Sequence, residues 1–139
     1  MRTPLKVAGY CVDTITEYSL IGTLCQWVYH DSPYQLDNYE VILITDDLKL
    51  RNYITCSDDS YPYPKIDFSE HNILLVRGRT SQTHNIFKNM RQLSANEFIL
   101  NIEAQLTGGD FTQPWNIAYI IPKSSEVEVN LIIRNPFID

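Results

Sequence analysis

In two segments near the C-terminal end of the chain, an apolar residue stands at every second position and the positions between are mostly polar. They run from Phe98 to Leu106 and from Val127 to Arg134. Successive side chains of a β-strand point to opposite faces, so each segment has one face for the core and one for water. Sheets with one wet face are typically antiparallel. The alternation therefore predicts a mainly β chain with antiparallel pairing.

Further segments of the chain are rich in β-branched and aromatic residues, as strands are. They are Lys6 to Thr16, Thr23 to His30, Tyr39 to Ile44, His71 to Arg77, Thr83 to Leu93 and Trp115 to Ile121. Short polar turns separate the later strands, at Gln92 to Asn96, Thr107 to Asp110 and Pro122 to Glu126. Connections this short predict that successive strands are neighbours in a sheet.

One short helix is expected directly after Ile44. Asp46 offers a side-chain oxygen to the unpaired N–H groups of a helix start, and its negative charge suits the helix dipole. Leu50, Tyr53 and Ile54 then recur at positions i, i+3 and i+4, which places them on one apolar stripe. The expected helix covers about residues 46 to 56.

The length of 139 residues suits a single β-rich domain, residues 1–139. Hydrophobic residues make up 44% of the chain, enough apolar surface to offset the entropy of ordering it. The expected fold is an antiparallel two-layer sandwich or part-open barrel with one short helix. The expected core is Ile42, Ile44, Leu74, Val76, Leu100, Ile102, Ile117, Tyr119, Leu131 and Ile133.

Charge and hydropathy argue against two classes of partner. Eleven Lys and Arg against 17 Asp and Glu give a net charge of -6, which repels phosphate backbones, so no nucleic-acid partner is expected. No apolar run approaches the roughly 20 residues that span a bilayer. No transmembrane segment is expected, and membrane attachment would come only through a lipoprotein leader removed upstream of Met1.

The sequence contains no motif of a catalytic or cofactor-binding site. It lacks a glycine-rich phosphate loop, a nucleophile elbow and a zinc-protease motif. The paired carboxylates Asp46-Asp47 and Asp58-Asp59 are explained by a helix cap and a solvated loop. No spacing brings the histidines together as metal ligands; these are His30, His71 and His84. We therefore expect no enzyme activity, no cofactor and no metal.

Three cysteines, Cys11, Cys25 and Cys56, lack the close CxxC spacing of most zinc and redox sites. At most one disulfide can form within the chain. A Cys11–Cys25 link between neighbouring strands is open if the protein is exported, and buried thiols that pack as small hydrophobes are the alternative. The redox compartment therefore stays undecided.

Five residues are candidates for contact with a protein partner: Tyr61, Tyr63, Trp115, Arg77 and Arg79. Tyr and Trp are enriched where partners dock. Trp115 follows a proline at a strand start and is also explained as core. The two arginines are also explained as charges that protect a solvated sheet edge.

Four segments between about residues 44 and 123 read ITDDLKLRNYI, YPKIDFSEHNILLVRG, NEFILNIEA and TQPWNIAYIIPK. In this order they resemble the C-terminal domain of bacterial protease-complex-complementing (PrcB-type) proteins, and also uncharacterised exported lipoproteins of gut bacteria. The most specific part is Pro64 to Ser69 followed by Ile73 to Val76, and Pro114 to Lys123 is the second. Thr80 to His84 lacks the two glycines and the tyrosine of a turn common in the family, so no role of that turn is transferred.

The resemblance implies a β-rich domain of exported proteins in the cell envelope, although the chain itself carries no export signal. It implies association with another protein, in the named family to sustain a protease, and no catalytic residues. The expected function is a non-catalytic cell-envelope interaction module that binds or stabilises a protein partner such as a protease. The alternative is a small apolar ligand carrier of lipocalin-like type, which needs a deep apolar pocket of at least about 300 Å³ lined by Trp27 or Trp115.

Overall fold

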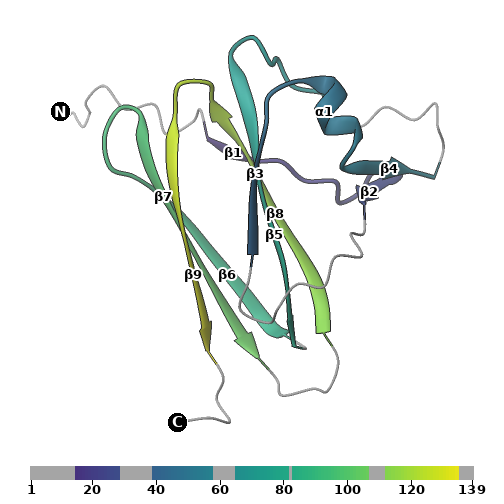
Figure 1. The fold of residues 1–139 in the computed structure, drawn as a ribbon, viewed down its shortest axis with the longest axis vertical. Coiled ribbons are helices and arrows are strands. Elements are labelled where there is room, and N and C mark those ends of the chain that lie inside the picture. Colours follow the sequence, from purple (N-terminus) through teal and green to yellow (C-terminus); the bar gives the residue numbers. More distant parts are fainter. Residues whose placement is uncertain (1–14, 29–38, 58–64, 82, 107–111, 135–139) are drawn as a thin grey trace. The chain divides into compact units, whose positions relative to one another are not determined.

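The computed structural model describes residues 15–28, 39–57, 65–81, 83–106 and 112–134. The described chain is mainly β, with nine strands and one short helix, as predicted (Figure 1). Its sheets are open and mainly antiparallel, of the kind from which β-sandwich folds are built. None of the described helices is long and apolar enough to cross a membrane. The chain divides into two compact units, so the prediction of a single domain stays a prediction.

The first unit comprises Ile15–Arg79 and Pro114–Lys123. It contains a four-stranded sheet in the order β1 (Thr16–Glu17), β8 (Thr112–Pro122), β5 (His71–Ser81) and β3 (Tyr39–Ile44). Strands β3 and β5 are antiparallel, with Ile44 opposite Ile73 and Tyr39 opposite Gly78. Strand β3 therefore lies at one edge of the sheet, and β5 lies inside it.

Side chains are buried on both faces of the inner strands of this sheet. One face packs Ile42, Ile44, Ile73 and Leu75 against a core completed by residues outside the sheet. Those residues are Tyr18, Leu20, Cys25, Leu50 and Ile54. On the other face the buried side chains are Leu74, Val76, Ile117, Tyr119 and Ile121. A strand buried on both faces reads as a continuous apolar run, which explains the sequence ILLV in the middle of β5.

The helix α1 is shorter than the sequence predicts, because it spans only Asp47–Arg51. Asp46 is its N-cap, as predicted, and its carboxylate accepts a hydrogen bond from Lys49 N at 2.7 Å. The sequence placed Leu50 and Ile54 on an apolar stripe, and both side chains are buried in the structure. The prediction of helix up to residue 56 is wrong, because Ile54–Cys56 forms strand β4.

Strand β4 pairs with strand β2 (Cys25–Trp27) in a two-stranded antiparallel sheet. The pairing places Cys25 opposite Cys56 and Trp27 opposite Ile54. Pairing with β2 holds Ile54–Cys56 in an extended conformation and so prevents the helix from continuing through these residues. The β-branched side chain of Ile54 also favours the extended conformation. Gly22 precedes β2 with φ of 84°, a left-handed conformation that favours glycine.

In its described part the second unit consists of a three-stranded sheet in the order β6-β7-β9. The strands are β6 (Thr83–Gln92), β7 (Glu97–Leu106) and β9 (Glu126–Arg134). Strands β6 and β7 form the expected antiparallel hairpin. Strand β9, however, runs parallel to β7, with Phe98 opposite Val127 and Ala104 opposite Ile133. Alternation sets which side chains share a face but not the direction of the neighbouring strand, so the expectation of antiparallel neighbours is wrong at this pair.

Burial agrees with most of the predicted core. All of the predicted residues except Leu131 and Ile133 are buried. These two are half-buried because they lie on β9, the outermost strand of its sheet. An outermost strand has a neighbour on one side only, so its side chains keep more contact with water.

The register of β3 gives a direct test of this fold. Ile44 is fully buried, whereas its neighbour Leu43 is 42% exposed on the opposite face. We expect Ile44→Ala to lower the free energy of unfolding by about 2–5 kcal/mol, through lost burial and the cavity left behind. The matched variant Leu43→Ala should cost about 1 kcal/mol or less. Urea unfolding measures both, and equal losses would contradict the register.

Candidate functional site

Of the five predicted contact residues, the structure describes the side chains of two, Arg77 and Trp115. Tyr61 and Tyr63 lie outside the described residues, and the side chain of Arg79 is also outside the description. Arg77 and Trp115 are both buried, at 6% and 7% exposure. Side chains this deeply buried offer little surface to a partner. The burial of Arg77 and Trp115 therefore does not support their prediction as contact residues.

Arg77 is held inside the first unit by two electrostatic contacts. It lies opposite Glu40 in the β3–β5 pair, and its Nε is 3.3 Å from Glu40 Oε2. Its guanidinium carbon lies 5.0 Å from the centre of the Tyr53 ring. A buried cation needs such partners because desolvation otherwise penalises its charge. Arg77 therefore ties the edge strand β3 to β5, which is a structural role.

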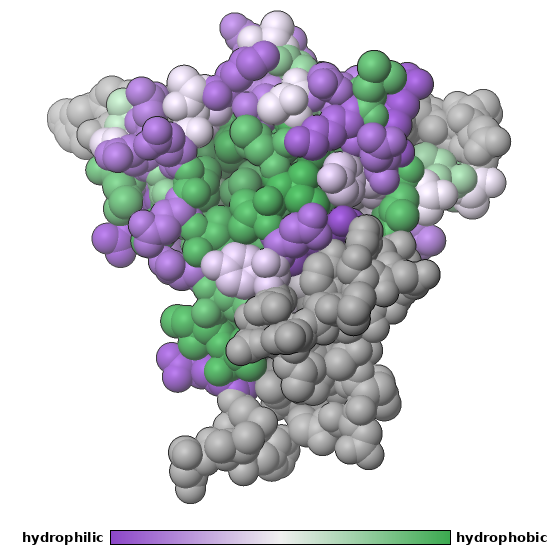
Figure 2. Space-filling model, in the orientation of Figure 1, coloured by the Kyte–Doolittle hydropathy of each residue, from purple (hydrophilic) through white to green (hydrophobic). Residues whose placement is uncertain are grey.

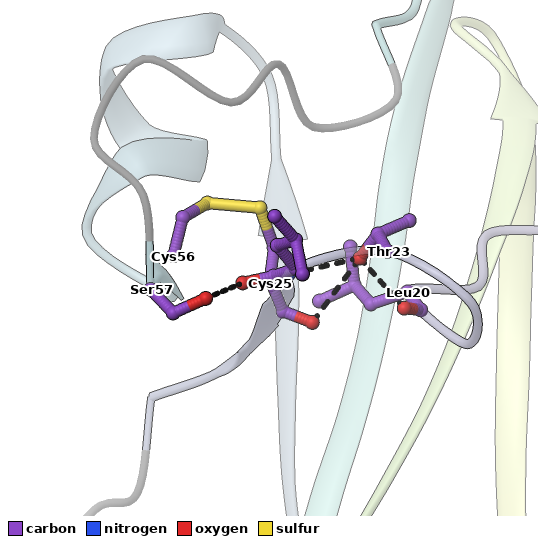
Figure 3. Close-up of a disulfide and its surroundings, with 6 residues drawn as sticks. Leu20, Thr23, Cys25, Cys56 and Ser57 are labelled. Atoms are coloured by element: carbon purple, nitrogen blue, oxygen red, sulfur yellow. Dashed lines mark hydrogen bonds between the residues drawn. A yellow bond between two sulfur atoms is a disulfide. The ribbon is translucent and has the colours of Figure 1, made fainter.

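A disulfide joins the two strands of the small sheet β2–β4 (Figure 3). Cys25 and Cys56 are bonded, with 31 residues between them in sequence. Backbone hydrogen bonds from Ser57 N to Leu24 O and from Val28 N to Tyr53 O flank the pair. Cys25 and Cys56 are therefore a non-hydrogen-bonded pair, the kind that brings opposite side chains closest together. The disulfide excludes the Cys11–Cys25 link that the sequence left open.

A recess of about 350 Å³ lies beside this disulfide. Its lining consists of Thr23, Leu24, Cys25, Gln26, Thr55, Cys56 and Ser57. Thr23 Oγ1 donates to Leu20 O at 2.7 Å and accepts from Cys25 N at 3.0 Å, so this hydroxyl organises the turn before β2 (Figure 3). The recess is open and partly polar, and neither Trp27 nor Trp115 lines it. It differs from the deep apolar pocket that a carrier of apolar ligands needs.

Three carboxylates surround a second recess, of about 270 Å³, at one end of the sheet in the second unit. They belong to Glu97, Glu126 and Glu128, and Phe98 and Val127 contribute apolar surface. Glu97 Oε1 accepts a hydrogen bond from Ser94 Oγ at 2.8 Å. Within the described ranges, no group of three or more His, Cys, Asp or Glu could hold a metal ion.

The two segments with the most specific family resemblance meet in a turn before β5. Asp67 accepts hydrogen bonds from Ser69, at 3.0 Å from the backbone N and 2.5 Å from Oγ. Lys123, which follows β8, donates from Nζ to Phe68 O at 2.8 Å and from its backbone N to Glu70 O. The Asp-Phe-Ser segment and the Pro-Lys segment therefore form one structural junction in the first unit.

The same hydrogen bonds lower the pKa of Asp67 below its ordinary value of 3.8. The Ser69 hydroxyl contributes most, followed by the Ser69 backbone N–H, and both stabilise the ionised carboxylate. The positive charges of His71 and Lys123 act in the same direction. The carboxylate is fully exposed, so it is suited to ordering the turn and not to holding a proton at neutral pH.

The edge strand β3 carries exposed apolar side chains. Val41 is 46% exposed and Leu43 is 42% exposed, while the alternate residues Ile42 and Ile44 point into the core. Figure 2 shows green, apolar side chains at the surface over β3. No strand pairs with the outer side of β3 in the part of the chain that the structure describes. Leu43 O accepts a hydrogen bond from Lys49 Nζ at 2.7 Å, so a lysine guards the end of this strand.

No family model, curated protein or solved structure matches this chain. Evidence about function therefore comes from the site geometry and from the sequence resemblance.

Sequence reasoning missed the apolar edge of β3. The run VILI at residues 41–44 reads like a strand buried on both faces, and nothing in it separates an inner strand from an edge strand. The lysine shortly after the run was the available signal, because lysines often protect edges. The position of β3 depends on its pairing with β5 about 30 residues later, which local patterns do not encode.

The disulfide should contribute strongly to stability. Closing a loop across 31 residues removes entropy from the unfolded chain, worth about 3–4 kcal/mol in the chain-entropy model. The double variant Cys25→Ser/Cys56→Ser should therefore unfold at lower urea than the oxidised protein, and at the same urea as the fully reduced protein. Alkylation of the denatured, unreduced protein should modify a single cysteine. Alkylation of all three would contradict the assigned disulfide.

The turn before β5 should lose stability in acid. The pKa of Asp67 is lower in the folded protein, so its contribution is present above the ordinary value of 3.8 and is lost as the pH falls through the folded pKa. We expect Asp67→Ala to lower the unfolding midpoint at neutral pH and to match the unmodified protein at strongly acidic pH. Glu70→Ala removes another exposed carboxylate from the same turn and is the control. A midpoint difference that does not change with pH would contradict this role.

Proposed function

We propose that this protein is a non-catalytic interaction module of the bacterial cell envelope that binds an extended segment of a partner protein along β3. The observation that carries the proposal is the combination of an edge position with exposed Val41 and Leu43. An extended peptide can add to a sheet edge through its backbone, while alternate side chains supply specificity. Edge strands with exposed apolar residues tend to aggregate unless something covers them, and a dedicated partner would cover this one.

The geometry of β3 limits what such a partner can be. Its exposed apolar side chains alternate with the buried ones, so the partner needs apolar residues at every second position to contact them. The Lys49 ammonium already donates a hydrogen bond to the Leu43 carbonyl, so this carbonyl is less available to a partner at that end of the strand. A strand of six residues, Tyr39–Ile44, offers a short edge. We therefore expect a small interface and a correspondingly modest affinity.

Two observations support placement in the cell envelope. The Cys25–Cys56 disulfide is typical of exported proteins, because thiols are kept reduced in the cytosol. The resemblance to PrcB-type domains adds association with another protein and makes a protease a reasonable partner to test. The hydrogen bond from Lys123 to Phe68 O, beside the Asp67–Ser69 turn, gives the resembling segments a structural role.

Site-specific photo-crosslinking in the bacterium that makes the protein tests this proposal. A photo-reactive phenylalanine analogue replaces Val41 or Leu43 in separate variants, and replaces Ile21, which is 93% exposed, in the control. We expect the same defined protein adduct from both β3 positions and none from the control. Adding Val41→Lys to the Leu43 probe should lower the adduct yield about tenfold, because a charged side chain on an edge opposes strand addition.

Two results would overturn the proposal. One is the same adducts from Ile21 as from Val41, which would show unspecific contact. The other is turnover of ester, phosphate or glycoside substrates by the purified protein that a single substitution abolishes.

A further inference from the structure

The second unit carries a row of three asparagines across the outward face of its sheet. In the strand registers, Asn89 lies opposite Asn101, and Asn101 lies opposite Asn130. Asn130 Nδ2 donates a hydrogen bond to Asn101 Oδ1 at 3.2 Å. Asn89 is exposed and the other two are half-buried, so all three amides reach water. The neighbouring residues of β7, Leu100 and Ile102, are buried on the opposite face.

Apolar side chains lie directly beside this row. Phe87 and Ile132 flank Glu103 in the next cross-strand row. Phe87 is 52% exposed and Ile132 is 46% exposed. Phe87 and Asn89 are two residues apart on β6, so their side chains share a face. An aromatic ring thus stands open to solvent next to a line of neutral hydrogen-bonding groups.

The charged side chains in the rows around the three asparagines balance one another. Arg134 Nε pairs with Glu103 Oε1 at 3.0 Å. Arg91 and Glu128 lie in one row on either side of Ile99. The rows from Ile99 to Gln105 therefore carry two cations and two carboxylates, and the further carboxylates Glu97 and Glu126 lie in one row at the end of the same face. The rows around the asparagines thus have no net charge that would attract a strongly charged ligand, and the carboxylates at the end of the face disfavour anions.

We propose that this amide face, formed by Asn89, Asn101, Asn130 and Phe87, binds a neutral carbohydrate. Each asparagine amide offers two donors and one acceptor oxygen, which suits sugar hydroxyls because these also donate and accept. The open Phe87 ring offers apolar surface for the C–H face of a sugar ring. Neighbouring strands are about 4.8 Å apart, so the row of amides extends over about the length of a disaccharide. Waters can bridge hydroxyls that the amides do not reach directly.

This proposal is independent of the proposed function of β3. The amide face uses other residues in the other unit, so variants of one surface are controls for the other. A carbohydrate ligand also suits a protein placed in the cell envelope.

Titration of the full-length ¹⁵N-labelled protein, followed by NMR, tests the amide face. The probes are soluble neutral oligosaccharides of α-linked glucose, β-linked glucose, xylose and mannose, added separately. At least one of them should shift the side-chain NH₂ signals of Asn89, Asn101 and Asn130 in a saturable way. Phe87→Ala and Asn101→Ala should each weaken this binding about tenfold, the usual effect of losing one stacking ring or a well-placed hydrogen bond.

Leu93→Ala is the matched control, because Leu93 is also 52% exposed but lies outside the amide face. It should leave the affinity unchanged. The proposal is overturned if none of the sugars shifts these signals, or if Phe87→Ala binds as well as the unmodified protein while keeping a folded spectrum. Shifts of the same signals by a peptide digest, with none by the sugars, would assign the face to a protein ligand and also overturn it.

Discussion

The pairing of β3 with β5 is the constraint on which the first unit depends. Strand β5 is buried on both faces from Asn72 to Gly78, so every side chain there must face the correct core. The register with β3 sends Ile42 and Ile44 into one of these cores and leaves Val41 and Leu43 at the surface. A slip of one residue would exchange the two sets. The Arg77–Glu40 contact opposes such a slip because the buried cation would lose its partner.

The strands could be predicted from the sequence because alternation and β-branched residues act locally. The run from β5 to β9 was located within a few residues, and the N-cap at Asp46 was correct. Long-range features were missed. The helix ends early because Ile54–Cys56 pairs with β2. Strand β9 pairs in parallel with β7, whereas β8, which lies between them in the sequence, belongs to another sheet. Neither pairing leaves a local signature.

The burial of the candidate contact residues Arg77 and Trp115 has a related origin. Residue type suggested Arg77 and Trp115, but burial depends on which strands become neighbours, and both lie on strands inside the sheet. The same neighbour relations expose Val41 and Leu43, two residues of a run that looks like core. They also align the three asparagines of the amide face, which stand far apart in sequence. Both proposed surfaces are therefore products of strand order and register.

Hydrogen exchange of backbone amides in the free, full-length protein tests most directly whether β3 is an open edge. In an antiparallel pair, alternate residues turn their N–H groups toward the neighbour. The account predicts slow exchange throughout Ile73 to Val76 and an alternation of slow and fast amides from Val41 to Ile44. Uniformly slow exchange along β3, equal to that of β5, would mean that another part of the chain already covers the edge. That result would contradict the account.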